Sequence, residues 1–221
     1  MLSRFVTVLA VSVFFVTTAS FAATSPTPPP KPQGAEVAFV SSLQKDLMTR
    51  FATAGDAENA GYFRYTKEDK SGSISYANLA WTSGDPQHPS QLWYDVNGKL
   101  LGADFSEPKT DAPPQLWGVS PQRWGTIRAH IHYVLSAADG KETYGATSAA
   151  KFIAAGGNAG APKAETLVKM GVVKDESSVK HVFLFPAIWD LQVWVKQNPN
   201  GAFAEMNPLV IPSATAGKPD M

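Results

Sequence analysis

Residues 91–104 read QLWYDVNGKLLGAD, two apolar runs joined by Asn97-Gly98. Asn-Gly is typical of a two-residue type I′ turn, because both central positions of that turn need a positive φ. The stretch therefore predicts a β-hairpin. One face is expected to carry Leu92, Tyr94 and Val96 together with Lys99, Leu101 and Ala103.

Strand patterns continue on both sides of this hairpin. Residues 62–65 and 74–77 flank a polar stretch and predict a second hairpin. Residues 126–135 alternate, with Ile127, Ala129, Ile131, Tyr133 and Leu135 on one face and Arg128, His130 and His132 on the other. Residues 179–185 and 191–195 are more uniformly apolar and predict two further strands, the first buried on both faces if it is central in its sheet.

Helical periodicity is strongest over residues 35–51, where apolar residues recur near every 3.6 positions. Shorter helices are expected at 147–155 and 162–170, the second with Pro162 near its start and Gly171 after its end. The predicted fold class is α+β, a mainly antiparallel β-sheet with an N-terminal amphipathic helix and short helices.

The N-terminus has the three parts of a secretory signal peptide. Arg4 gives a charged start, residues 5–16 are apolar, and Ser20-Phe21-Ala22 resembles a cleavage site. The apolar run is too short to span a bilayer, which takes about 20 residues. We therefore expect residues 1–22 to be removed and the protein to be exported to the periplasm or the medium, with no transmembrane segment after cleavage.

Residues 23–34 form a proline-rich linker, with five prolines between Thr24 and Gly34. Residues 35–221 are expected to form a single globular domain, which is long enough for a hydrophobic core. The chain has no cysteine, which excludes disulfides, thiolate catalysis and zinc–thiolate sites. Its formal net charge is +0 without basic runs, which argues against nucleic acid as a partner.

His130 and His132 stand two apart on a predicted strand, so both imidazoles face the same side. Such a pair can bind Zn or Cu when further ligands join it. His181 is the candidate third metal ligand, and Glu142 or Asp139 could supply a carboxylate. The alternative is a solvated strand face, since the neighbouring Arg128 disfavours a bound cation.

Six tryptophans form a large aromatic set, and Trp117 and Trp124 lie in a stretch rich in proline and glycine. Exposed tryptophans in a loop are candidates for contacting a ligand such as a carbohydrate, whereas buried ones would pack in the core. Asp190 beside Trp189 is a candidate perturbed carboxylate. No GxSxG or phosphate-binding loop motif is present.

The C-terminal region has the spacing W-x3-N-P-x-G-x-F-x3-N-P, from Trp194 to Pro208. Together with residues 61–63 and 92–104, this motif resembles a group of uncharacterised bacterial secreted proteins. The resemblance implies a shared fold and a secreted role and implies no activity.

The sequence thus predicts an exported protein that binds a small-molecule ligand or metal ion on the face carrying Arg128, His130 and His132. Two alternatives stay open: a hydrolytic enzyme that uses His130 and His132, and a module that contacts carbohydrate through its tryptophans. In the hydrolase, the histidines would be metal ligands or a general base with Asp190 or Glu142.

Overall fold

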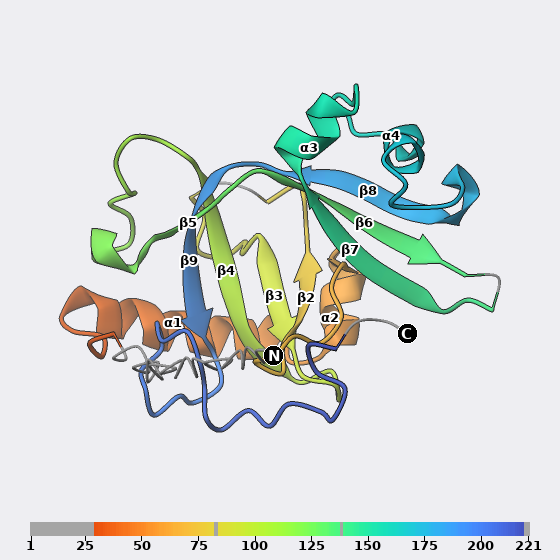
Figure 1. Cartoon of the computed structure of the whole chain (residues 1–221). Helices are drawn as coiled ribbons and strands as arrows, with labels where there is room; N and C mark the ends of the chain where they lie inside the picture. Colours follow the sequence, from red (N-terminus) through yellow and green to blue (C-terminus); the bar gives the residue numbers. More distant parts are fainter. Residues whose placement is uncertain (1–28, 82–83, 138, 219–221) are drawn as a thin grey trace, which may run out of the picture.

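The computed structural model describes residues 29–81, 84–137 and 139–218. The predicted signal peptide and the first part of the proline-rich linker lie outside these residues. Two antiparallel sheets and a long helix make up the architecture (Figure 1). This arrangement confirms the α+β class with mainly antiparallel strands.

The larger sheet has six strands in the order β1-β2-β3-β4-β9-β5. Their bounds are β1 Phe63–Arg64, β2 Ile74–Ala77, β3 Gln91–Tyr94, β4 Leu100–Pro108, β9 Ile188–Trp194 and β5 Gly125–Ile127. The smaller sheet has the order β7-β6-β8, with β6 at His130–Ser136, β7 at Glu142–Ser148 and β8 at Val179–Phe185. The hairpin predicted around residues 62–77 is present as β1 and β2.

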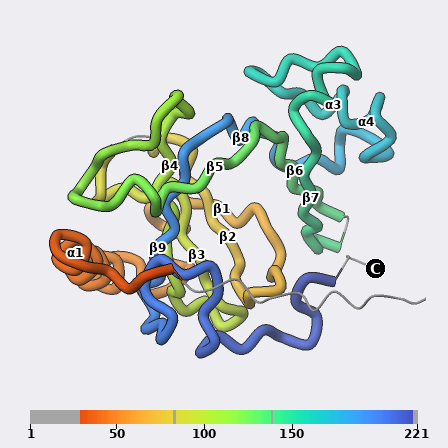
Figure 2. Tube along the Cα trace, turned by 60° about the vertical axis from the view of Figure 1, so that its left-hand side comes forward, coloured from red at the N-terminus to blue at the C-terminus, as the bar shows by residue number. Residues whose placement is uncertain are grey.

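Helix α1 (Ala35–Arg50) covers one face of the six-stranded sheet (Figure 2). It begins after Gly34, which has φ +54°, and it carries Glu36 in its first turn and Arg50 in its last, as the helix dipole favours. Leu43 and Leu47 are buried against sheet residues such as Leu92 and Leu191. Val37 and Met48, which fit the apolar period, are instead 53% and 50% exposed.

The remaining helices are short: α2 spans Ala54–Asn59, α3 Ala149–Ala154 and α4 Ala164–Lys169, and two 3₁₀ turns lie at Pro121–Arg123 and Glu176–Ser178. Helices α3 and α4 lie beside the three-stranded sheet, far from α1 (Figures 1 and 2). Phe152 of α3 and Leu167 of α4 are buried with Ile131 of β6, which closes a separate core on that side.

The chain crosses from one sheet to the other twice. Strand β5 leads into β6 through Arg128 and Ala129, and β8 leads into β9 through Pro186 and Ala187. The predicted continuous strand over 126–135 is therefore wrong, because its two parts pair in different sheets. As a result Ile127 packs in the cluster between the sheets, not in the row of Ile131, Tyr133 and Leu135.

The hairpin at residues 91–104 is confirmed, but its turn differs from the prediction. The Gly98 amide donates to the Asp95 carbonyl (2.9 Å), and the Asp95 amide donates to the Lys99 carbonyl (3.0 Å). Gly98 has φ +69° and Asn97 has no positive φ. Three residues, Val96, Asn97 and Gly98, therefore form the loop, with glycine in the left-handed position of a bulge.

A register shift at Trp93 and Tyr94 adds one residue to β4. Leu101 consequently packs with Trp93 on the face away from α1, and not with Leu92 and Tyr94 as predicted. Val96 does not join the core either, since it is 52% exposed.

Candidate functional site

Two aspartates lie on the face of the six-stranded sheet that α1 does not cover. Asp104 of β4 pairs with Gln192 of β9, and Asp190 of β9 pairs with Ser106 of β4. Residues two apart on a strand point to the same side, so both carboxyl groups share this face as diagonal neighbours. Each aspartate is only 5% exposed.

Neither carboxyl group is fully hydrogen-bonded within the described part of the chain. Trp93 Nε1 donates to Asp104 Oδ2 at 2.8 Å. Oδ1 of Asp104 and Oδ1 of Asp190 are buried and have no hydrogen-bond partner among the described residues. A buried carboxylate oxygen without a donor is costly to the fold, which is why such atoms often mark a binding or catalytic site.

Gly102 explains how Trp93 reaches Asp104. Gly102 lies opposite Trp93 in the β3–β4 ladder. A Cβ at Gly102 would approach the Trp93 ring to 2.6 Å and the Val193 carbonyl to 2.7 Å. The glycine therefore lets the indole lie flat over β4, with its N–H directed at the next residue on that face, Asp104.

The electrostatics of the pair favour the protonated form. Burial, followed by the charge of Asp190, raises the pKa of Asp104 well above its usual range, although the Trp93 hydrogen bond opposes this shift. Burial raises the pKa of Asp190 to about 7. Two adjacent carboxyl groups in a dry environment cannot both ionise easily, so near neutral pH the pair retains a proton.

The two aspartates line a cavity of about 530 Å³. Its polar lining includes Gln91, which is 4% exposed and whose Oε1 accepts a hydrogen bond from the Tyr65 hydroxyl. The Gln91 Nε2 amide donates no hydrogen bond to any described residue. The other lining residues are Asp69, Lys70, Ser71, Ser73, Ser75, Trp93, Ile127, Gln192, Trp194, Glu205 and Met206.

The predicted histidine pair lies between the two sheets. His130 Nε2 and His132 Nε2 are 2.9 Å apart, and His130 Nδ1 is 2.7 Å from the Arg128 carbonyl. The His132 ring packs edge-on against Tyr65, with ring centroids 4.7 Å apart. Burial and then the neighbouring His130 lower the pKa of His132 to about 3. His132 is thus a neutral, packed ring and not part of a solvated face.

The other predicted metal ligands lie apart from this pair. His181 stacks on Phe63 with ring centroids 4.9 Å apart. Glu142 pairs with Lys180 and accepts a hydrogen bond from the Tyr144 hydroxyl at 2.7 Å, and Asp139 accepts one from the Lys141 amide in a turn. Among the described residues, no group of three or more histidine, aspartate or glutamate side chains could hold a metal ion.

Trp117 and Trp124 pack against the helix α1 side of the core. Trp124 is 5% exposed, and Trp117 stacks on Phe39 with centroids 5.3 Å apart and planes 8° apart. Trp117 also holds a positive φ of 56°, which is rare for a bulky residue. Their rings pack with other aromatic side chains in the way expected of core tryptophans.

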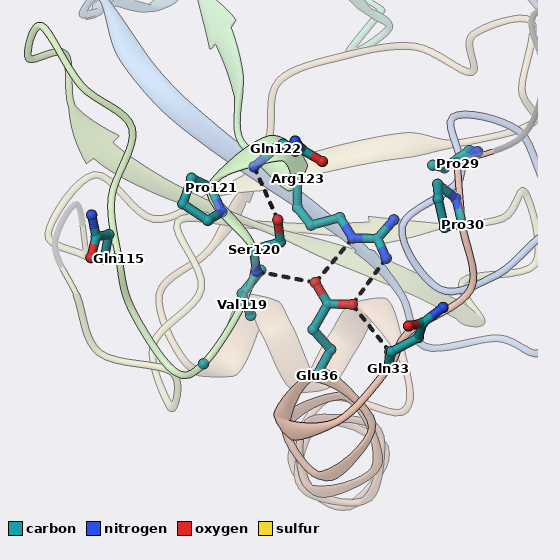
Figure 3. Close-up of a pocket in the computed structure, with 11 residues that line it drawn as sticks. Pro29, Pro30, Gln33, Glu36, Gln115, Val119, Ser120, Pro121, Gln122 and Arg123 are labelled. Atoms are coloured by element: carbon teal, nitrogen blue, oxygen red, sulfur yellow. Dashed lines mark hydrogen bonds and ion pairs between the residues drawn. The ribbon is translucent and has the colours of Figure 1, made fainter.

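A larger hollow of about 870 Å³ lies between the start of α1 and the loop before β5 (Figure 3). Its charged groups satisfy each other, since Arg123 donates to both carboxylate oxygens of Glu36, at 3.1 and 2.9 Å. The amides of Gln33 and Ser120 donate to the same carboxylate. The hydrogen bonds to Arg123, opposed by burial, lower the pKa of Glu36. This group joins the loop to α1 and has no free carboxylate oxygen for a ligand.

Sequence reasoning singled out Asp190 but missed Asp104 and the cavity that they share. A signal was present, because each is the only charged residue in a largely apolar strand segment, LLGADF and IWDLQVW. Strand pairing was needed to bring the two together.

No family model matches the chain, and neither a curated protein nor a solved structure matches it. None of the helices among the described residues is long and apolar enough to cross a membrane. The cavity with Asp104 and Asp190 is therefore the feature on which a function can be argued.

Proposed function

We propose that the chain is an exported protein, periplasmic or extracellular, that binds a small organic ligand in the cavity lined by Asp104 and Asp190. One observation carries this proposal: two adjacent carboxyl groups are buried in that cavity with an unpartnered oxygen each. A structural role alone would favour apolar residues at these positions, because an unsatisfied buried carboxylate destabilises the fold.

The composition of the cavity supports a ligand of this kind. Small-molecule sites combine apolar walls with a few convergent polar groups, in volumes of roughly 300–1,000 Å³. Here Trp93 and Trp194 supply the wall, and Gln91 and the aspartates supply the polar groups. The two tryptophans are themselves fixed, since Trp194 Nε1 donates to the Ala204 carbonyl at 2.6 Å.

A second candidate is acid–base hydrolysis at the same pair. The two carboxyl groups have different surroundings, because only Asp104 accepts a hydrogen bond from Trp93. Pairs of carboxyl groups in different environments serve as general acid and base in many hydrolases. Incubation of a bound compound with the protein, followed by NMR, would reveal turnover and favour this second function.

The test is a ligand-observed NMR screen of a small-molecule library, repeated with a variant whose cavity is filled. Ser75 points into the cavity from β2, and Ser75→Phe should abolish binding of true cavity ligands. Ser136→Phe on β6 is the matched control, because Ser136 is also a half-buried strand serine but lies outside the cavity. Thermal melts check that both variants fold. If no compound loses binding only in Ser75→Phe, the proposed function is wrong.

A further inference from the structure

We propose that the ligand of this cavity is a small hydroxylated organic cation, whose ammonium group lies between the carboxylates of Asp104 and Asp190. This inference rests on the proposed function and names its ligand class. The geometry supplies two acceptors side by side on neighbouring strands, each with one buried, unpartnered oxygen, and both residues line the same cavity.

The charges around the cavity favour a cation over a neutral compound. Four lining residues are acidic and one is basic: Asp69, Asp104, Asp190 and Glu205 against Lys70. A neutral polyol could donate hydrogen bonds to the two unpartnered oxygens, but it would not offset the repulsion that arises when both aspartates ionise. An ammonium group removes that repulsion and donates to both oxygens at once.

The tryptophan walls of the cavity strengthen an ion pair between the ammonium group and the aspartates. Trp93 and Trp194 are 6% and 2% exposed, and their rings pack edge to face with centroids 5.4 Å apart. These side chains exclude water beside Asp104. Because the attraction between opposite charges grows as the effective dielectric constant falls, an ammonium group gains more here than at the surface.

The hydroxyl groups of the ligand are inferred from Gln91. Its Oε1 accepts a hydrogen bond from the Tyr65 hydroxyl, its Nε2 donates to no described residue, and Gln91 as a whole is only 4% exposed. An oxygen on the ligand close to its ammonium group would accept from this amide. A metal ion has no oxygen that could accept a hydrogen bond from this amide. The described residues also offer no group of three or more histidine, aspartate or glutamate side chains that could hold one.

Isothermal titration calorimetry at pH 8 with three probes tests this inference. Glucamine (1-amino-1-deoxysorbitol) carries both an ammonium and hydroxyl groups, sorbitol replaces the ammonium by a hydroxyl, and hexylamine lacks the hydroxyls. We expect glucamine to bind at least about tenfold more tightly than either of the other two. That ratio corresponds to about 1.4 kcal/mol.

Three variants locate the bound cation. Asp104→Asn and Asp190→Asn should each weaken glucamine binding by about tenfold or more and leave sorbitol binding unchanged. Asp111→Asn is the control, since Asp111 is an exposed aspartate outside the cavity. Thermal melts of all variants separate a lost contact from a lost fold.

The outcomes separate this inference from the proposed function. If glucamine and sorbitol bind equally well, or if neither asparagine variant changes glucamine binding, the inference that the ligand is a cation is wrong. Saturable binding of calcium chloride alone that both asparagine variants abolish overturns it in favour of a metal. If no probe binds but the screen yields a compound sensitive to Ser75→Phe, the inference fails and the proposed function stands. If neither experiment yields binding, both fail.

Discussion

Asp104 and Asp190 lie diagonally across the β4–β9 ladder, Asp104 opposite Gln192 and Asp190 opposite Ser106. Direct pairing of either aspartate with a basic residue would have neutralised it. The ladder instead brings two acids together over a cavity and leaves one oxygen of each without a donor from the described residues. Such an arrangement costs stability, and binding sites commonly carry this kind of cost.

The aspartate pair predicts an unusual pH dependence. Because folding raises the pKa of Asp190 to about 7, the folded state binds more protons than the unfolded state above pH 4, and stability falls as the pH rises toward 7. Asp190→Asn removes this loss and should stabilise the protein at pH 8 by up to about 4 kcal/mol, at about 1.4 kcal/mol for each pKa unit. Urea unfolding at pH 4.5 and pH 8 measures the difference, which should be smaller at pH 4.5. A variant less stable than wild type at pH 8 would indicate a structural partner for the carboxylate.

The ion pair of Glu36 and Arg123 should be a main support of the loop before β5. Both side chains are less than 10% exposed, at 7% and 9%. Glu36→Gln leaves the guanidinium without its charge partner and should cost about 3 kcal/mol. Glu165→Gln is the matched control, because the Glu165–Lys169 pair is exposed to solvent and should contribute little to stability.

The same pair adds an acid-sensitive contribution. Since its hydrogen bonds to Arg123 lower the pKa of Glu36, the stabilisation is present above pH 4.5 and is lost as the pH falls below that value. Urea midpoints of wild type and Glu36→Gln should therefore converge between pH 5 and pH 3. A constant difference over that range would show that charge is not the source of the effect.

The hairpin turn makes a prediction that separates two turn types. Gly98 has φ +69°, so Gly98→Val should cost about 1–2 kcal/mol. Asn97 has no positive φ, so Asn97→Ala should change stability by less than about 0.5 kcal/mol. In a type I′ turn both substitutions would be costly. Denaturant midpoints of the two variants decide between the three-residue and the two-residue loop.

His132 should remain neutral across the physiological range. Burial and the adjacent His130 lower its pKa to about 3, and the unfolded chain binds the proton near the ordinary value of 6.5. The folded state therefore loses stability through His132 as the pH falls below 6.5. In an NMR titration from pH 8 to pH 5 its ring resonances should stay constant, whereas in urea they should shift. A titration midpoint near 6 in the folded protein would refute the packed position between the sheets.

The local patterns of the chain were sufficient for most elements. The helix at Ala35–Arg50, the hairpin of β3 and β4 and the strand Val179–Phe185 follow from residues adjacent in sequence. The strand lies at the edge of its sheet and not at its centre, so only Phe183 and Phe185 are buried in it. Periodicity and turn residues act over a few positions, so they can be read without knowing the rest of the fold. The face of β6 that carries His130 and His132 was also correctly separated from Ile131, Tyr133 and Leu135.

Tertiary structure decided where these elements lie and what they form together. Alternation along β4 and β9 assigns each side chain to a face, but only the pairing of the strands brings Asp104 beside Asp190. The break at Arg128 and Ala129 likewise depends on tertiary structure, because the residues before it pair in the six-stranded sheet and those after it pair in the three-stranded sheet. Strand pairing is a contact between residues far apart in the chain, and its register is set by the whole core, so no local pattern determines it.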